Sequence, residues 1–466
     1  MKVKVNMPKE FRVRDPVHHF IKLNEEEVAV VGTQVFQRLR GIRQLAMANL
    51  VYPGALHTRF EHSLGVCHLA GLLSEQLGLS EDERRLIRLA GLLHDLGHGP
   101  FSHVSEYALD LYADRNMLPS ECKEEKIHEV VTGKLIRSDP EILRIVGESK
   151  CEKIAKLLAE GRGPNALRAI VSGPLDSDKQ DYLLRDSYFC GVPYGIFDIH
   201  QFHRSLVLGG EGENQELMIS PDGVHAVEQY ALAKYYMTTN VYRHRVRLIT
   251  DQMLIRAIRL GIEEDNIKEL KSLYSFDNSA EFYENYRRWN DSRFLLTFGN
   301  QIGNTTLCGQ LIDRLQSREL LKRVFFSRDI RDFDDETKEV IQAINKKENA
   351  ELRKRLEEEI ASLIKEKTTQ PVEQRFVIVN AFDIKSVRTT SRDDEAHILV
   401  KDRPDPIPFD QASSLFRSID ERYSDMFVEV YAPVKWDTRI EKEQILNRLK
   451  QPIFELLERE SKEAVK

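Results

Sequence analysis

Two histidines and two aspartates, widely separated along the chain, constrain its fold more than any other feature. His62 lies in the stretch 57–66, His94 and Asp95 form a doublet in the stretch 92–103, and Asp178 follows much later. Adjacent imidazole and carboxylate side chains can reach a single divalent ion, and two of each suit iron, manganese, zinc or magnesium without choosing among them. We therefore predict a divalent metal site formed by these four residues.

The segments that carry these ligands have helical patterns. Residues 80–83 form a capping box, apolar residues follow at helical spacing, and glycines after the doublet end that helix. His62 shares a helix face with apolar residues, so we expect its side chain to point inward. The pattern therefore predicts a helical core over about residues 33–200, with His94 and Asp95 at a helix C-terminus.

The remaining patterns complete a mainly α chain with a β-hairpin insertion and a small C-terminal α+β lobe. We expect an irregular or extended N-terminal segment over residues 1–23, a hairpin over 203–221, one long helix over 222–262 and one charged helix over 335–367. Short strands are expected near residues 376–380, 397–400 and 426–431, and a terminal helix closes the chain. This organisation predicts two domains, residues 1–330 and residues 331–466.

Composition limits the class of protein. The chain has 466 residues and a formal net charge of −7, which argues against a general nucleic-acid coat but leaves room for a local basic funnel. Its five scattered cysteines are typical of a reducing compartment. The N-terminal residues have no apolar stretch of signal-peptide length, and no apolar run approaches a membrane span. We expect a cytoplasmic protein without a membrane segment.

Residues near the proposed ligands could carry out phosphoryl hydrolysis. His103 and Glu106 are three residues apart on a predicted helix, so the carboxylate can orient the imidazole as a general acid, and His98 follows the doublet closely. Arg59 and Lys179 each adjoin a ligand segment and are candidate phosphate clamps. Alternatively, Arg59 pairs with Glu61 or Asp95, and Lys179 is solvated.

The segment after Asp178 places polar groups in line. Asp178, Tyr182 and Asp186 are spaced four residues apart and form one ridge of a helix. Such a ridge could follow a substrate from its phosphate to its sugar, where a carboxylate would accept a hydrogen bond from a hydroxyl.

The motifs together resemble the HD superfamily, and most closely its SAM-and-HD-domain type of deoxynucleoside triphosphate (dNTP) triphosphohydrolase. The resemblance is carried by RDPVH, FQRLRGIRQL, YPGALHTRFEHSLGV, HDLGHGPFSH and DSDKQDYLLRD, and covers about residues 12–203 and 225–260. The HD-type sequence begins close to the N-terminus, so we expect no SAM domain before it.

The resemblance implies an HD-domain fold and release of deoxynucleoside and intact triphosphate from a dNTP. It implies metal ligation by His62, His94, Asp95 and Asp178, and a homo-oligomer. Catalytic or triphosphate-contacting roles are implied for Arg59, His98, His103, Glu106, His128 and Lys179. Positions near the sugar and base are implied for Gln44, Leu45, Tyr182, Asp186 and Tyr242, with Tyr242 disfavouring a 2′-hydroxyl.

The chain departs from the family pattern at two positions. Some animal members are activated by guanine nucleotides through an aspartate and an arginine; Arg40 fits the arginine, but Gly32 stands where the aspartate would be. We therefore expect an activating nucleotide near Arg40 without assuming guanine. Arg243 replaces a glutamine of the animal form, so the base preference cannot be inherited.

Two other functions remain open from the sequence. One is a different HD phosphohydrolase that cleaves nucleoside monophosphates, cyclic nucleotides or single-stranded nucleic acid. The other is a non-catalytic nucleotide-binding or nucleic-acid-binding regulator. The ridge beyond Asp178 together with Tyr242 favours dNTPs, and the intact ligand set favours an enzyme.

Overall fold

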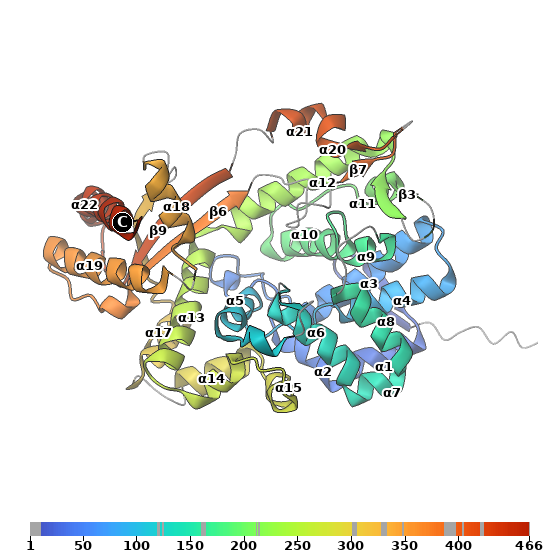
Figure 1. The fold of residues 1–466 in the computed structure, drawn as a ribbon, viewed down its shortest axis with the longest axis horizontal. Coiled ribbons are helices and arrows are strands. Elements are labelled where there is room, and N and C mark those ends of the chain that lie inside the picture. The colour runs from blue at the N-terminus through green and yellow to red at the C-terminus, as the bar shows by residue number, and fades with distance from the viewer. Residues whose placement is uncertain are drawn as a thin grey trace, which may run out of the picture. The chain divides into compact units, whose positions relative to one another are not determined.

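Helices form most of the described chain in the computed structural model, which confirms the mainly α prediction (Figure 1). The structure describes residues 11–118, 122–123, 125–159, 165–210, 212, 215–300, 305–327, 333–346, 349–385, 398–402, 405–419 and 424–465. They belong to two compact units: Met1–Val241, Glu269–Phe294 and Val387–Glu421 form the first, and Tyr242–Lys268, Leu295–Ser386 and Arg422–Lys466 form the second. A compact unit need not fold independently, so the predicted domain boundary after residue 330 stays a prediction.

The first unit is a helical assembly with two small sheets. Its helices are α1 (Glu25–Val31), α2 (Gln34–Gln37), α3 (Arg59–Gln76), α4 (Glu81–Leu93), α5 (His103–Tyr112), α6 (Ile127–Ser138), α7 (Pro140–Val146), α8 (Glu148–Ala159), α9 (Ala166–Val171), α10 (Ser177–Cys190), α11 (Ile199–Ser205), α12 (Val224–Met237), α15 (Ala280–Tyr286), α20 (Phe409–Ala412) and α21 (Ser414–Ile419). Helices α14 (Lys268–Tyr274) and α16 (Asp291–Leu295) lie at the points where the chain passes between the units.

Helix α3 lies at the centre of the packing that forms the site, because it contacts both α4 and α10. It begins with a capping box in which Thr58 and Glu61 satisfy each other's backbone N–H groups. A Cβ atom at Gly65 would lie 1.8 Å from Oδ1 of Asp181 on α10, so only glycine allows this close approach. The same helix therefore directs His62 toward α10.

The sheets of the first unit confirm two predictions and correct a third. Strands β1 (Phe11–Asp15) and β2 (His19–Leu23) lie in the predicted N-terminal segment, of which residues 1–10 are outside the described residues, and β3 (Leu206–Gly209) pairs with β4 (Glu216–Ile219) as the predicted hairpin. The strand predicted at 397–400 was assigned to the C-terminal lobe, and this was wrong. Residues Leu399–Val400 form β7, which pairs with β4 and with β8 (Ile407–Pro408); His397 lies outside the described residues.

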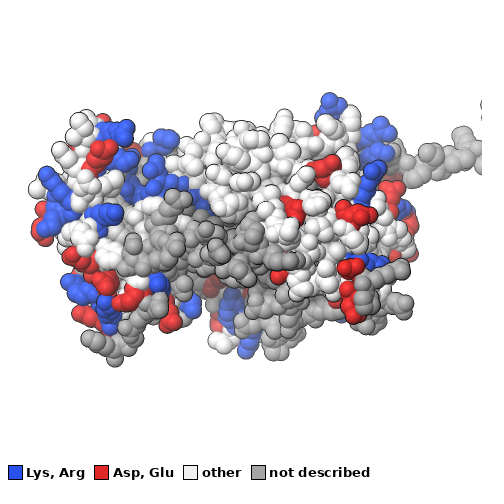
Figure 2. Space-filling model, turned by 90° about the horizontal axis from the view of Figure 1, so that it is seen from above, with Lys and Arg blue, Asp and Glu red and all other residues white. Residues whose placement is uncertain are grey.

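The second unit contains a three-stranded antiparallel sheet covered by helices. Its elements are α13 (Arg245–Glu263), α17 (Leu307–Gln316), β5 (Lys322–Ser327), α18 (Asp335–Ala343), α19 (Ala350–Thr368), β6 (Ile378–Lys385), β9 (Ser424–Ala432) and α22 (Arg439–Val465), with strand order β5-β9-β6. Val428, Val430, Leu356, Ile360 and Leu449 belong to its buried core. Over this unit, at the left of Figure 2, lysines and arginines are interspersed with acidic side chains, as expected of a solvated surface.

Two long helices predicted from periodicity are interrupted. The segment 222–262 forms α12, a π-helical turn (Thr238–Tyr242) and α13, and the side chain of His244 caps α13 by accepting from Val246 N. The segment 335–367 forms α18 and α19 rather than one helix. Periodicity alone does not reveal such breaks, because the apolar pattern resumes with nearly the same phase. None of the described helices combines the length and apolar composition needed to cross a bilayer.

Candidate metal centre and active site

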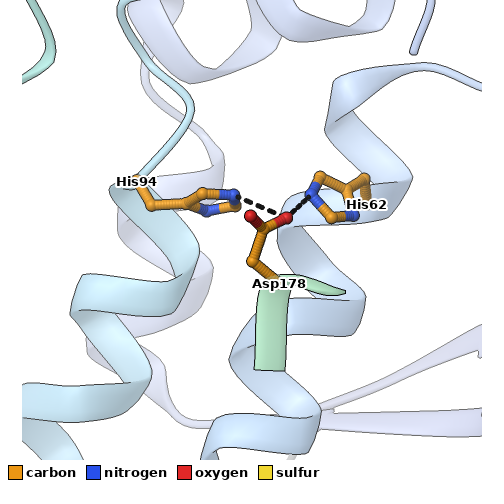
Figure 3. Close-up of side chains that lie close together, drawn as sticks. All are labelled: His62, His94 and Asp178. Atoms are coloured by element: carbon orange, nitrogen blue, oxygen red, sulfur yellow. Dashed lines mark hydrogen bonds and ion pairs between the residues drawn. The ribbon is translucent and has the colours of Figure 1, made fainter. Parts of the chain in front are cut away.

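Three of the four predicted metal ligands converge on one point. His62 comes from α3, His94 follows the last residue of α4, and Asp178 lies in the first turn of α10 (Figure 3). Asp178 Oδ1 lies 3.0 Å from His62 Nε2 and 3.8 Å from His94 Nε2. One ligand atom from each residue lies within 4.8 Å of the others, so the three could hold one ion.

The fourth predicted ligand, Asp95, lies directly beside this group. Its Oδ1 is 3.2 Å from His94 Nε2, and its Oδ2 is 3.7 Å from His62 Nε2. Oδ2 also accepts a hydrogen bond of 2.6 Å from Arg59, whose Nε donates to Ser102 Oγ. Arg59 is therefore paired with Asp95, which was one of the two alternatives left open, and it fixes the carboxylate next to the ligands.

The donor set fits a divalent metal. His94 Nδ1 donates to the carbonyl of Gly91, which turns Nε2 toward Asp178, and buried Nε2 has no hydrogen-bond partner within the described part of the chain. Burial lowers the pKa of His62, but hydrogen bonds to Asp178 and Asp181 outweigh it and raise that pKa to about 10. Burial would raise the pKa of Asp178, yet the imidazoles of His62 and His94 hold it well below its usual range. A bound cation would be stabilised by the negative charge of the carboxylates and by the lone pairs of the imidazoles gathered at this point.

A buried network that the sequence did not predict orients His62. His62 Nδ1 donates to Asp181 Oδ2 at 2.8 Å, and His18 Nε2 lies 2.6 Å from Asp181 Oδ1. Arg185 binds both oxygens of Asp181 and donates a third bond to Asp15 Oδ2. A carboxylate that accepts from the far nitrogen of a ligating histidine fixes its tautomer and orientation. The available sequence signal was the spacing of Asp181 and Arg185 by four residues on one helix.

The predicted catalytic side chains form a second group beside the metal centre. His103 Nδ1 lies 2.7 Å from Glu106 Oε1, as their spacing on α5 predicts. His98 Nε2 is 3.2 Å from Asp95 Oδ1, and the ring of His98 lies 4.4 Å from that of His128. Burial would raise the pKa of Glu106, but the neighbouring His128, His103 and His98 hold it well below its usual range. The group thus places an exposed imidazole next to an ionised carboxylate.

Local backbone geometry holds this second group in place. A Cβ atom at Gly97 would lie 2.0 Å from the carbonyl of His128, so glycine is required where α6 approaches the turn that carries His98. Phe101 and Ser102 adopt positive φ angles of 60° and 52° directly before α5. Non-glycine residues rarely adopt this conformation, and such strain concentrates at functional sites.

Two lysines supply positive charge beside the metal centre. Lys179 Nζ donates to Asp176 Oδ2 at 2.7 Å, so this predicted clamp is paired rather than solvated. Lys234 on α12 was not predicted. Burial, followed by the nearby Lys179, lowers the pKa of Lys234 to about 8. A bound anion would favour the charged form of both lysines.

The residues predicted near the sugar and base are only partly available for ligand contacts. Asp186 Oδ1 lies 2.6 Å from His57 Nε2, and both side chains are buried. Gln44 and Leu45 are also buried, and Gln44 Oε1 has no hydrogen-bond partner among the residues described. Burial raises the pKa of Tyr182 well above its usual value, with further contributions from Asp178, Asp176 and Asp186, so its hydroxyl stays protonated.

Tyr242 and Arg243 belong to the second unit, and Arg40 lies on the surface of the first. The ring of Tyr242 faces the guanidinium of Arg247 at 5.5 Å, and Arg243 lies 5.0 Å above the ring of Phe382. The exposed Arg40 stacks on Phe60 at 3.4 Å and donates to Gln37. The roles of Tyr242 at a sugar and of Arg40 at an activating nucleotide stay predictions.

The chain is similar to known proteins in sequence and in fold. The sequence matches the HD domain family over residues 59–180 and the HD associated region over residues 198–452. A solved structure of a hypothetical protein from Aquifex aeolicus superposes with a TM-score of 0.67 at 26% identity, covering 95% of this chain and 100% of that one.

Curated relatives share part of their length with the chain. Uncharacterized protein MJ1154 of Methanocaldococcus jannaschii is 35% identical over 268 residues, which are 58% of this chain and 53% of that protein. Deoxynucleoside triphosphate triphosphohydrolase SAMHD1 of Bos taurus is 29% identical over 390 residues, or 75% of this chain and 62% of that protein. The chain thus spans little more than half the length of these relatives. It belongs to the HD superfamily, in the family that carries the HD associated region, and is related to the superfamily's deoxynucleoside triphosphate triphosphohydrolases.

Proposed function

We propose that this protein is a metal-dependent phosphohydrolase that converts deoxynucleoside triphosphates into deoxynucleoside and triphosphate. The observation that carries the proposal is the convergence of His62, His94 and Asp178, with Asp95, next to the imidazole and carboxylate pair of His103 and Glu106. A divalent ion held by the first group would polarise a phosphoryl oxygen and make water a better nucleophile. Iron, manganese, magnesium and zinc all remain candidates for this ion.

Residues of the chain supply the other requirements of phosphoryl hydrolysis. His103 is 58% exposed while Glu106 is largely buried, so the carboxylate orients an imidazole that faces a substrate. This pair is suited to deliver a proton to the leaving oxygen. Lys179 carries positive charge next to Asp178, and Lys234 lies near Lys179 and Asp176, so the negative charge of a triphosphate would be stabilised there.

We expect the protein to distinguish deoxyribose from ribose. Tyr182 lies one turn along α10 from Asp178, which supports a substrate that extends from the metal centre along this helix, whereas Asp186 is buried against His57. Tyr242 is our candidate for excluding a 2′-hydroxyl, on the strength of the family resemblance. Excluding one buried hydroxyl is worth about 1–3 kcal/mol.

By resemblance we expect a homo-oligomer and an activating nucleotide near Arg40, and we expect the protein to act in the cytoplasm. The exposed guanidinium of Arg40, supported by Phe60, is suited to contact a phosphate or a base.

A substrate panel tests the function. The purified protein is incubated with manganese or magnesium and each of four dNTPs and four ribonucleotides, and products are separated by chromatography. We expect triphosphate and deoxynucleoside from dNTPs and little turnover of ribonucleotides. Each dNTP is also added at low concentration as an activator of the others. Release of monophosphate, or equal use of both sugars, would replace this proposal with a different HD phosphohydrolase.

A further inference from the structure

His98, Glu106 and His128 form a second group of potential metal ligands in the described part of the chain. One ligand atom from each lies within 4.8 Å of the others. His98 Nδ1 is 3.5 Å from Glu106 Oε1, and His128 Nδ1 is 4.0 Å from Glu106 Oε2. These separations are too long for good hydrogen bonds. They are close to the ~3.4 Å that separates two ligand atoms bound at ~2.1 Å to one tetrahedral zinc ion.

The two imidazoles present buried nitrogens that the protein leaves unsatisfied. His98 and His128 are 5% and 7% exposed, and Nδ1 of each lacks a hydrogen-bond partner among the described residues. A buried polar atom without a partner costs about 1–3 kcal/mol. Burial lowers the pKa of His128 well below its usual value, which keeps a lone pair on this ring available at neutral pH. An ion at this point would satisfy both nitrogens at once.

The three side chains are held by independent elements in a fixed arrangement. His98 lies in the turn after α4, Glu106 on α5 and His128 on α6. The carbonyl oxygen of His98 accepts a hydrogen bond of 2.8 Å from Nη2 of the buried Arg38. The backbone N–H of Gly97 donates a hydrogen bond of 2.9 Å to Thr132 Oγ1 on α6. A ligand group that is already ordered loses little conformational entropy when an ion binds.

This group is distinct from the first metal centre, although one residue touches both. The imidazole of His98 turns Nε2 toward Asp95 Oδ1 and Nδ1 toward Glu106. Its two nitrogens therefore face different ligand sets. Two imidazoles and one carboxylate favour zinc and similar borderline ions over magnesium, which prefers oxygen ligands.

We propose that His98, Glu106 and His128 form a second cation site that binds zinc or a similar transition-metal ion, separately from the site of His62, His94, Asp95 and Asp178. This inference has a regulatory consequence that rests on the proposed function. Glu106 Oε1 lies 2.7 Å from His103 Nδ1 and 3.5 Å from His98 Nδ1, so an ion bound between His98 and Glu106 would compete with His103 for this oxygen and weaken the orientation that the proton-donating role requires. Zinc at the second site is therefore an inhibitor of an enzyme whose first site holds another metal.

Zinc stoichiometry tests the second site without relying on activity. The full chain is stripped of metal with a chelator, titrated with zinc against a competing indicator, and analysed for bound zinc after gel filtration. We expect two ions per chain for the wild type, one for Asp178→Ala and one for Glu106→Gln. The double variant Asp178→Ala/Glu106→Gln should bind none with comparable affinity. Circular dichroism confirms that each variant is folded.

Two further variants separate the possible outcomes. His128→Gln removes a different ligand of the same group and should also bind one ion. His225→Ala is a matched control, because His225 forms an exposed i,i+3 pair with Glu228 like that of His103 with Glu106, and it should still bind two ions. A wild type that binds one zinc ion, or a Glu106→Gln protein that binds two, overturns the second site. Two bound ions without triphosphate release in the substrate panel would instead overturn the proposed function and leave the second site standing.

Discussion

The first unit buries Arg185 between Asp15 and Asp181, and the second unit buries Arg256 against Glu357. The two arginines have similar environments, but their carboxylates have different further partners. Asp181 also accepts from the metal-ligand candidate His62, whereas Glu357 accepts from the backbone of Val379 on β6. The first network thus positions a functional side chain, and the second joins α13, α19 and a strand. Buried charge by itself does not identify a site; its further partner does.

Substitution of His103 should give the largest effect on turnover with the smallest effect on stability. His103→Ala removes an exposed side chain whose hydrogen-bond partner is Glu106. General acids typically contribute about 10²–10⁴-fold, so we expect kcat to fall by that factor while metal content is unchanged. Steady-state kinetics beside metal analysis measure this, and loss of the metal would instead move His103 among the ligands.

Breaking the ion pair of Arg256 with Glu357 in the second unit should lower stability without affecting the metal. Glu357→Gln leaves the buried guanidinium of Arg256 without its counter-charge, which should lower the free energy of unfolding by about 2–3 kcal/mol. Metal affinity should be unchanged, because Glu357 contacts no candidate ligand in the described structure. Urea unfolding and a metal titration report the two quantities. A large loss of metal affinity in Glu357→Gln would show that the Arg256 network, like the Arg185 network, supports the metal centre.

The first unit's network should affect the metal directly. Asp181→Asn keeps the size of the side chain but removes the charge that orients His62, and substitutions of such supporting carboxylates typically reduce metal affinity about 10–100-fold. The control is Glu357→Gln measured in the same titration. Equal metal affinity in wild type and Asp181→Asn would show that His62 does not need this carboxylate.

A smaller effect is expected from a buried histidine outside both networks. Burial, followed by the nearby His200, lowers the pKa of His203 to about 4, below the ~6.5 of an unfolded chain. The neutral form is favoured in the folded state, so its stabilisation is present above pH 6.5 and is lost as the pH falls toward 4. We expect a loss of about 1–2 kcal/mol between pH 7 and 5. His203→Gln should reduce that loss in unfolding experiments; an unchanged pH profile would contradict the assignment.

The sequence predicted the parts of the site that depend on short-range patterns. The capping box of α4 and the glycines after it predicted where His94 and Asp95 would lie, and the i,i+3 spacing predicted the pair of His103 with Glu106. The network of His18, Asp15 and Asp181 was not predicted, because its members come from distant segments and only packing brings them together. The unpaired nitrogens of His98 and His128 likewise depend on the close approach of α6 at Gly97.

We expect Asp178 to hold a catalytic metal together with His62, His94 and Asp95. The most direct test compares Asp178→Ala with the exposed carboxylate control Asp222→Ala. Both proteins are loaded with manganese, and bound metal and triphosphate release from dNTPs are measured on the same samples. We predict that Asp178→Ala loses both bound manganese and activity while its circular dichroism is unchanged, and that Asp222→Ala behaves as wild type. Full activity of Asp178→Ala with unchanged metal content would show that Asp178 is not a ligand of a catalytic metal.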